Sequence, residues 1–328
     1  IVGGMFTGTA FFGTLARTSS GYEDVFVANL SGSGGWNWVV TAGGSDEDQL
    51  FALALGPAGG IQITGWYFDD ITFGSHTLQI GGVADLFVGK LSHSGSWTSA
   101  VRAGGTGGAG YIFGYSIEID GSGNTYVTAI YYDTVHFDSI TKSGGGLSGG
   151  YILWDLVVAK LSSSNIWDWV ADASGPESEY GFDLALDGSG SVYLVGFFRG
   201  SSMFGSTTLS GTNREAFVAK LSSGGNWLWA ISAGGSGSDA AGQLAPLPNG
   251  NFLVVGHFEN SATFGSHSIS STGAAPSVPM AIVTGSRSTM AGVMNSLCSR
   301  LSTTLTSAPS ARAIAAVRAS SPASSSAA

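Results

Sequence analysis

The sequence is poor in cysteine, in charged residues and in long apolar runs. Cys298 is the only cysteine among 328 residues, which excludes an intrachain disulfide and leaves the redox compartment open. Charged residues make up 10% of the chain, against roughly 25% in an average soluble domain. No run of about 18 apolar residues is present, so no transmembrane helix is expected.

Basic residues are especially scarce. Residues 1–284 hold all 22 acidic side chains but only 8 of the 12 basic ones, a formal charge of −14. Nucleic-acid binding needs clustered Lys and Arg, so this balance argues against a nucleic-acid partner. An acidic body is compatible with cations or with uncharged partners such as glycans.

Glycine, serine, threonine, valine and aromatic residues dominate what remains. Glycine accounts for 52 residues, about twice its usual share. No periodic array of Ala, Leu, Glu and Lys of the kind that forms long amphipathic helices occurs before the last quarter of the chain. The composition therefore predicts an all-β protein of short strands joined by tight turns.

A repeating pattern runs through residues 1–284. Its clearest part is an alternating strand, a Gly-rich turn and a second alternating strand, as in residues 182–196. A leucine that ends a later strand recurs at intervals of 61, 70 and 60 residues, and the third repeat carries an insertion near residues 142–154. The positions of this leucine are Leu30, Leu91, Leu161 and Leu221.

Each repeat predicts four strands. In the fourth repeat they are expected over residues 182–187, 192–197, 216–221 and 227–231. The architecture we expect is a β-propeller of about five four-stranded blades with roughly 60-residue repeats; a β-solenoid, whose coils are usually shorter, is the alternative. The first repeat begins at its second strand, so its first strand must come from the C-terminal segment or from sequence upstream.

Four motifs resemble the bacterial SBBP β-propeller repeat family. They are residues 216–222 (AFVAKLS), 226–230 (NWLWA), 233–237 (AGGSG) and 120–128 (DGSGNTYVT). The resemblance covers roughly residues 1–284. It implies a propeller fold and a secreted or surface-associated bacterial protein, but it implies no defined activity.

The pattern ends after Thr284. Residues 285–328 contain no acidic and no aromatic residue and are rich in Ser and Ala. We therefore expect a repeat domain over residues 1–284 and a tail over 285–328 that is disordered or a linker. A sorting remnant and an out-of-frame end are the alternatives for this tail.

Two motifs point to chemistry but have simpler explanations. The Asp-Gly-Ser-Gly runs at Asp120 and Asp187 resemble part of a calcium loop but lack the later ligands of an EF-hand, and an aspartate can cap its own turn. We therefore expect no cofactor, with Ca²⁺ as the single possibility considered. Residues 1–4 (IVGG) match the mature N-terminus of trypsin-like proteases, but no nucleophile motif follows. No catalytic or metal-binding residue is predicted.

Paired tryptophans recur two residues apart at the start of the last strand. This spacing places both rings on one strand face. Recurrence at one position of the repeat favours packing over a sugar-binding platform. The four side chains expected to be mainly buried are Trp167, Trp169, Trp227 and Trp229.

Candidate ligand contacts come from a comparison of the repeats with one another. Just past the second strand one aromatic position recurs in every repeat, while the residues around it differ. A selective site needs such unlike groups brought together on one loop face. The candidates are Trp66, Asp69, Asp70, Tyr132, Asp133, Arg199, His257 and Glu259.

These observations together favour a non-catalytic extracellular or cell-surface module that binds or scaffolds a glycan or a protein. One alternative is a secreted enzyme that acts on glycans through acidic residues of the loop face. The other is a structural subunit of a surface layer or appendage. The sequence leaves the ligand and the oligomeric state open.

Overall fold

The computed structural model describes residues 1–247, 250–270 and 278–284. Ile1–Thr284 form one compact unit. Within the described ranges the chain is all-β, with several antiparallel sheets and a single 3₁₀ turn at Pro57–Gly59. None of the helical structure in these ranges is long and apolar enough to cross a membrane. The predicted tail, residues 285–328, lies outside the described residues.

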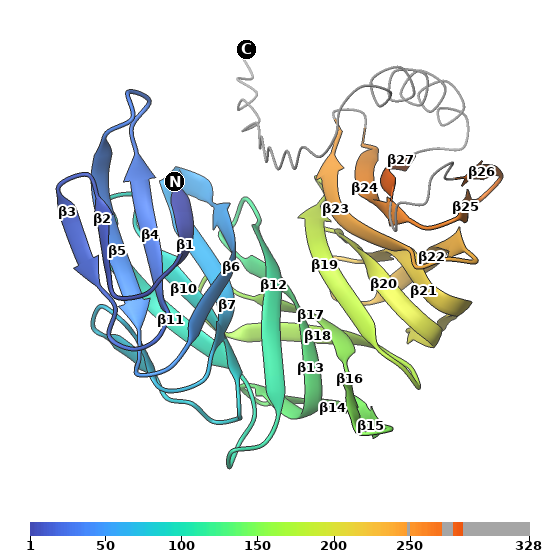
Figure 1. The fold of residues 1–328 in the computed structure, drawn as a ribbon, viewed down its shortest axis with the longest axis horizontal. Helices are drawn as coiled ribbons and strands as arrows, with labels where there is room; N and C mark the ends of the chain where they lie inside the picture. The colour runs from blue at the N-terminus through green and yellow to red at the C-terminus, as the bar shows by residue number, and fades with distance from the viewer. Residues whose placement is uncertain (248–249, 271–277, 285–328) are drawn as a thin grey trace. The chain divides into compact units, whose positions relative to one another are not determined.

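The first sheet has the order β1-β4-β5-β8-β9 (Figure 1). Its strands are β1 (Val2–Phe6), β4 (Asp24–Leu30), β5 (Trp36–Gly43), β8 (Ile71–Phe73) and β9 (His76–Leu78). Between β1 and β4 the chain forms a separate hairpin of β2 (Thr9–Phe12) and β3 (Leu15–Thr18).

The second sheet is the predicted four-stranded unit without additions. It has the order β6-β7-β10-β11, so each strand pairs with the next one in the repeat. The strands are β6 (Asp48–Leu55), β7 (Ile61–Tyr67), β10 (Asp85–Leu91) and β11 (Trp97–Ala103).

The third and fourth units are joined into one large sheet. The third contains β12 (Tyr111–Ile119), β13 (Thr125–Phe137), β17 (Asp155–Leu161) and β18 (Trp167–Ser174). The fourth contains β19 (Glu179–Leu186), β20 (Val192–Phe204), β21 (Thr207–Leu221) and β22 (Trp227–Gly235). The insertion predicted in the third repeat forms β14 (Ile140–Gly144), β15 (Gly146–Ser148) and β16 (Tyr151–Leu153).

The last unit is shorter. It pairs three strands in the order β23-β24-β27, and a further hairpin of two strands follows β24 in the sequence. The three sheet strands are β23 (Ala240–Pro246), β24 (Phe252–Phe258) and β27 (Val278–Thr284). The hairpin strands are β25 (Ser261–Phe264) and β26 (His267–Ser270).

The recurring Phe-Gly element links each unit to the one before it. In the second repeat it forms the β8–β9 hairpin, whose turn glycine Gly74 has a φ of +62°. Phe73 of this hairpin pairs with Ala42 at the end of β5, in the preceding repeat. The same backward pairing joins β20 to β18 and β25 to β22. Backbone hydrogen bonds therefore connect successive repeats.

Apolar side chains of neighbouring sheets fill the space between them. The first strands of consecutive units, β6, β12, β19 and β23, contact one another in that order. Fully buried residues such as Ile63, Phe87, Val127 and Phe217 come from the second and third strands, which are covered on both sides.

The tryptophans pack at the junctions between repeats. Trp167 is only 4% exposed, whereas Trp169, Trp227 and Trp229 are half-buried, so the prediction of burial is right for the first and only in part for the others. The Trp167 ring meets Phe137 edge-on with 5.0 Å between centres, and its Nε1–H donates to a carbonyl of the preceding repeat at 3.2 Å. These contacts agree with a packing role.

Candidate ligand-binding surface

A bulge at the same place in three repeats turns an aromatic ring out of the strand. In β6 the pairing with β7 shifts between Leu50 and Ala52, which leaves Phe51 as the extra residue. Tyr115 in β12 and Phe182 in β19 occupy the same bulged position. Bulges commonly redirect a side chain beside a functional site.

A glycine on the neighbouring strand makes room for each of two bulges. A Cβ at Gly65 would lie 1.7 Å from the carbonyl oxygen of Gln49, and a Cβ at Gly196 would lie 1.7 Å from that of Tyr180. Only glycine allows the two backbones to approach this closely without a shift. The close approach at these two bulges therefore depends on the glycines of β7 and β20.

The bulged rings belong to a continuous array of aromatic side chains across three repeats, here called the aromatic surface. Phe51 stacks on Trp66 at 4.4 Å and contacts Tyr115 at 5.2 Å between ring centres. Tyr180 stacks on Phe197 at 4.7 Å. The members are Phe51, Trp66, Phe68, Tyr111, Phe113, Tyr115, Tyr132, Trp154, Tyr180, Phe182 and Phe197.

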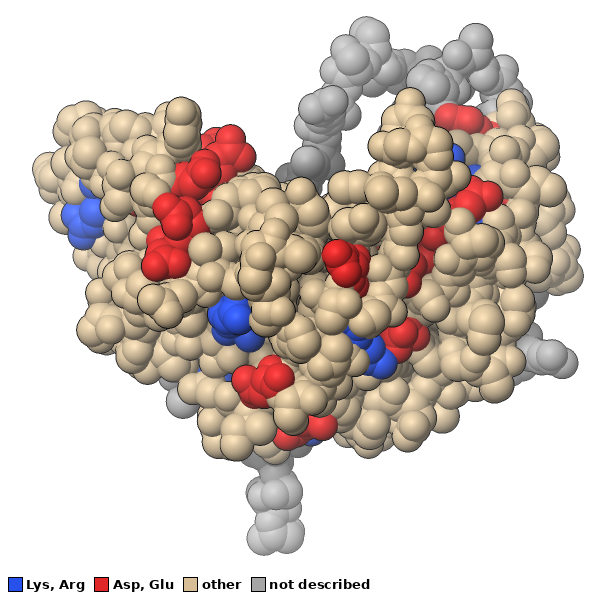
Figure 2. Space-filling model, turned by 90° about the horizontal axis from the view of Figure 1, so that it is seen from below, with Lys and Arg blue, Asp and Glu red and all other residues tan. Residues whose placement is uncertain are grey.

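These rings are accessible as well as stacked. Phe51 is 47% exposed, and the others except Phe197 keep part of their surface in water. A contiguous, partly solvated aromatic area of this kind marks an interaction site more often than a packing fault. On the face that Figure 2 shows, most of the surface is uncharged, and the acidic side chains form separate small groups.

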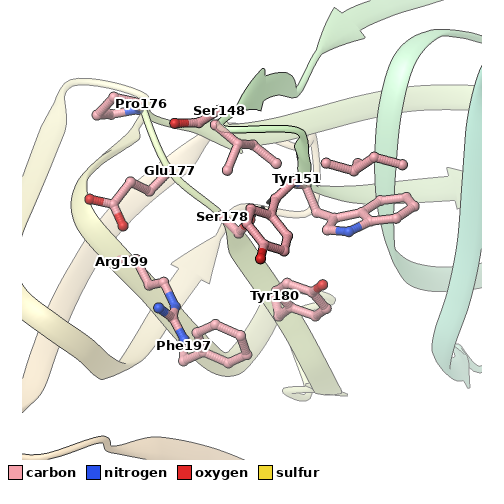
Figure 3. A pocket seen from close by; sticks show the side chains of 11 residues that line it. Ser148, Tyr151, Pro176, Glu177, Ser178, Tyr180, Phe197 and Arg199 are labelled. Atoms are coloured by element: carbon pink, nitrogen blue, oxygen red, sulfur yellow. Dashed lines mark hydrogen bonds between the residues drawn. The ribbon is translucent and has the colours of Figure 1, made fainter.

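A pocket of about 610 Å³ adjoins the aromatic surface (Figure 3). Glu177 and Arg199 lie on one side of it, and Tyr151 and Tyr180 lie on the other. Pockets that combine aromatic walls with a few polar groups are the usual form of small-ligand sites. Its remaining lining residues are Ser148, Ile152, Leu153, Trp154, Pro176, Ser178 and Phe197.

A second arginine lies beside Arg199, on the neighbouring strand. Arg214 pairs in register with Arg199, and its guanidinium covers the Phe197 ring. Partial burial, with Arg199 adding to it, lowers the pKa of Arg214 below its ordinary value. Burial and the Arg214 charge likewise lower the pKa of His257. The structure thus places Arg199 and His257 close enough to Arg214 for each to interact with its charge.

Three of the eight predicted contacts join this site, since Trp66 and Tyr132 belong to the aromatic surface and Arg199 lines the pocket. Asp69 and Asp70 instead hold a turn. The Asp69 carboxylate accepts a hydrogen bond from the Ser45 hydroxyl, and the Ile80 N–H donates to Asp70 Oδ1 at 2.8 Å. The hydrogen bond from Ser45 lowers the pKa of Asp69.

The last three predicted contacts lie in other settings. Asp133 is exposed, with a φ of +66°, where β13 bends towards the insertion. Glu259 accepts a hydrogen bond from the Ser238 N–H at 3.2 Å, and its own N–H donates to Asp239. His257 and Glu259 lie on the fifth repeat, near Arg214 but not among the lining residues of the pocket.

Sequence reasoning missed the bulged rings. Phe51, Tyr115 and Phe182 are aromatic at one position of three repeats, and that recurrence was the available signal. Alternation alone assigns them to a strand face, because it carries no information about register shifts. Trp154 and Tyr180 lie in the insertion and the next first strand, where the repeats align poorly.

A second missed feature is a buried pair of carboxylates at the junctions between repeats. In three repeats an acid at the start of the third strand is followed 24 residues later by an acid at the start of the next repeat. The second acid's N–H donates to the carbonyl just before the first acid, at 2.7–2.8 Å. The pairs are Asp24 with Asp48, Asp155 with Glu179, and Glu215 with Asp239.

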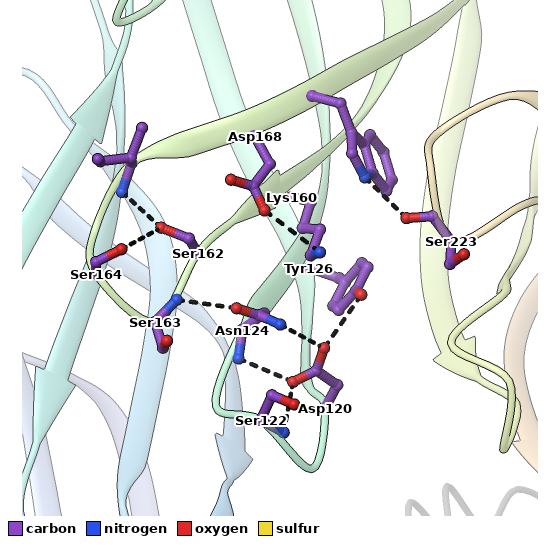
Figure 4. Close-up of polar contacts among 12 residues, drawn as sticks. Asp120, Ser122, Asn124, Tyr126, Lys160, Ser162, Ser163, Ser164, Asp168 and Ser223 are labelled. Atoms are coloured by element: carbon purple, nitrogen blue, oxygen red, sulfur yellow. Dashed lines mark hydrogen bonds and ion pairs between the residues drawn. The ribbon is translucent and has the colours of Figure 1, made fainter.

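The carboxylates of the two Asp-Gly-Ser-Gly turns accept hydrogen bonds from their own turns, as Figure 4 shows for Asp120, and Asp187 also pairs with Lys220 at 3.1 Å. Asp120 accepts the N–H groups of Ser122 and Asn124, both at 2.9 Å, and the Tyr126 hydroxyl at 3.2 Å. Partial burial acts to raise the pKa of Asp187, but hydrogen bonds from Ser189 and other donors outweigh it and hold that pKa at about 2. The contacts support the turn-capping role.

No protein-family model matches the sequence, and no curated protein matches it either. Among solved structures the chain is similar to a protein of unknown function from Bacteroides caccae, with a TM-score of 0.39 and 10% sequence identity. The match covers 82% of this chain and 73% of that one. It names neither a family nor an activity, so the resemblance to SBBP repeats stays a prediction.

Proposed function

We propose that this chain is a non-catalytic, β-propeller-type module that binds a glycan through the aromatic surface and its adjoining pocket. The observation that carries the proposal is the stacked, solvent-accessible array of rings, with Arg199 and Glu177 beside it. The apolar faces of sugar rings pack on aromatic side chains, while charged groups orient the hydroxyls.

Two features support the propeller arrangement. The second, third and fourth units are four-stranded and antiparallel, and their strands pair in sequence order, as β6-β7-β10-β11 does. The first strands of consecutive units contact one another, which is the relation of inner strands around a propeller axis. Long loops that follow the second strand then share one face, where Arg199 and Tyr132 lie.

The residues that line the pocket are better suited to binding a glycan than to hydrolysing it. Glycoside hydrolysis generally uses two carboxyl groups about 5–10 Å apart across the scissile bond. Of the residues that line the pocket, Glu177 alone carries a carboxylate. A secreted or cell-surface location belongs to the proposal because glycans are most abundant there. A protein partner stays the alternative occupant of the same surface.

The test is a glycan array followed by calorimetric titration with the best ligand. Variants Trp154→Ala and Arg199→Ala should weaken binding at least about tenfold, the size expected when a central contact is truncated. The matched control is Tyr22→Ala, because Tyr22 is 71% exposed and lies outside the aromatic surface. Equal affinity of all three variants and the parent protein would exclude this surface as the binding site.

A further inference from the structure

The three buried carboxylate pairs occupy equivalent places but differ in how their oxygens are satisfied. In the first pair Asp24 accepts the Ser20 N–H at 2.9 Å, and Asp48 accepts the Gly44 N–H at 2.7 Å. In the last pair Asp239 accepts two backbone N–H groups, at 2.8 and 3.1 Å. Backbone donors therefore satisfy carboxyl oxygens in both of these pairs, as buried polar groups require.

The pair of Asp155 and Glu179 is less well compensated, because a backbone hydrogen bond from Gly145 reaches Asp155 but no group among the described residues donates to either oxygen of Glu179. Asp155 Oδ1 and both carboxylate oxygens of Glu179 are buried without a hydrogen-bond partner. The Tyr131 hydroxyl and the Ser202 hydroxyl are also buried and unpartnered. All four residues are at least 97% buried. Five oxygen atoms at one junction thus have no hydrogen-bond partner.

These oxygens converge on the same region. The Tyr131 hydroxyl and Asp155 Oδ2 lie 2.6 and 2.1 Å from the position that a Cβ at residue 144 would occupy. Asp155 and Ser202 both lie beside the Glu179 carboxylate and interact with it: burial raises its pKa, Asp155 acts to raise it further and Ser202 acts to lower it. A glycine at 144 leaves room for this cluster.

The second repeat shows how the protein itself balances one such charge. Asp85 is buried there and forms an ion pair with Arg102, and the residue 24 positions later is Ala109 rather than an acid. The third repeat has Asp172 at the position of Arg102, and Asp172 is already paired with Lys142 at 2.5 Å. Thus no basic side chain replaces Arg102 beside Asp155 and Glu179.

We propose that Asp155 and Glu179 bind a divalent cation of the calcium class, with the hydroxyls of Tyr131 and Ser202 completing the oxygen lining. Calcium takes six to eight oxygen ligands from carboxylates, carbonyls and water. A zinc-type site would use three or four His, Cys or carboxylate ligands, whereas the lining here supplies two carboxylates and two hydroxyls. This inference is independent of the proposed glycan site.

The experiment compares chelator-treated protein with and without CaCl₂. Calcium should raise the melting temperature of the parent protein by several degrees, because a ligand that binds only the folded state stabilises it. Titration calorimetry should show one site. Glu179→Gln and Asp155→Asn should each weaken calcium binding at least about 100-fold. The matched control Asp239→Asn, at the satisfied pair, should leave calcium affinity unchanged.

A proton shared between the two carboxyl groups is the competing explanation. In that case calcium would not change the melting temperature of the parent protein, and Glu179→Gln would fold as well or better without it. That pair of results would overturn the proposal. If the charge variants fail to fold, Ser202→Ala serves instead: it keeps both carboxylates and should weaken calcium binding several-fold, and an unchanged affinity would count against the site.

Discussion

The guanidinium carbon of Arg214 lies 3.8 Å from the centre of the Phe197 ring, so this cation covers one face of a ring in the aromatic surface. Tyr180 stacks on the same ring with an angle of 13° between the planes. Arg214 is thereby held against the ring, while Arg199 on the neighbouring strand is exposed. Two arginines in register thus have different surroundings.

This difference predicts separable effects on stability and binding. Arg214→Leu should lower the free energy of unfolding by about 1 kcal/mol through loss of the cation–π contact. Arg199→Ala should change it by less than about 0.5 kcal/mol but weaken ligand binding. Urea unfolding and ligand titration of the two variants check this. A larger stability loss for Arg199→Ala than for Arg214→Leu would contradict it.

Stability should fall as pH rises, in part because of Asp48. Burial raises the pKa of this carboxyl from 3.8 to about 8, with the Asp24 charge adding to the effect. Between about pH 4 and pH 8 the folded protein therefore holds a proton that the unfolded chain has already released. The contribution is complete below pH 4 and is lost as pH rises through 8, by up to about 5 kcal/mol.

The Asp48→Asn variant isolates this effect. Its free energy of unfolding should depend less on pH between 4 and 8 than that of the parent protein, when both are measured by urea titration. The control is Asp46→Asn, which alters a nearby exposed carboxylate. Parallel pH profiles for the parent and the Asp48 variant would show that Asp48 is charged in the folded protein.

Trp167 should be the most costly of the junction tryptophans to remove. Its ring is buried against Phe137, whereas Trp229 is half-buried against Tyr193. Trp167→Ala should therefore lower the free energy of unfolding by about 3–5 kcal/mol, and Trp229→Ala by less. Thermal and urea unfolding provide the measurement, and the reverse order of the two losses would refute the assignment.

The glycines beside the Phe51 and Phe182 bulges should not tolerate a methyl group. Gly196→Ala places a Cβ against the Tyr180 carbonyl and should cost about 2 kcal/mol or more while displacing the Tyr180 ring from the pocket. The third repeat supplies a matched comparison, since it carries Ala129 at this position, and Ala129→Gly should cost at most about 1 kcal/mol. Unfolding and ligand titration would be measured on both, and similar behaviour would rule out the close approach.

The local hairpins could be predicted from the sequence, and the contacts between repeats could not. The strand predicted over residues 192–197 begins at the first residue of β20. β20 itself continues to Phe204, and its pairing with β21 shifts register just after Arg199. Alternation and turn residues define the first part of such a strand. The pairing of its far end with β18 depends on a different repeat, so no local pattern carries it.

Part of the candidate site could likewise be predicted from the sequence, and part could not. Trp66, Tyr132 and Arg199 could be found because neighbouring repeats differ there. Phe51 could not be recognised as a surface ring, because a bulge is a property of pairing rather than of one strand. In the sequence Glu179 is one acidic residue among several, with no local feature that distinguishes it. Only the fold places it in a buried pair with Asp155.

The backward-pairing hairpins also impose an order on biosynthesis. The end of β5 (Trp36–Gly43), at Ala42 and Gly43, is paired by β8 (Ile71–Phe73), which the ribosome makes some thirty residues later. Until then that part of the edge offers unpaired backbone groups to any other strand in reach. The sheets that end in β5, β18 and β22 are thus completed only by the next repeat, so the nascent chain carries an unfinished sheet while each of them waits for its partner. Chaperone capture of stalled chains should be strongest just before a Phe-Gly hairpin emerges.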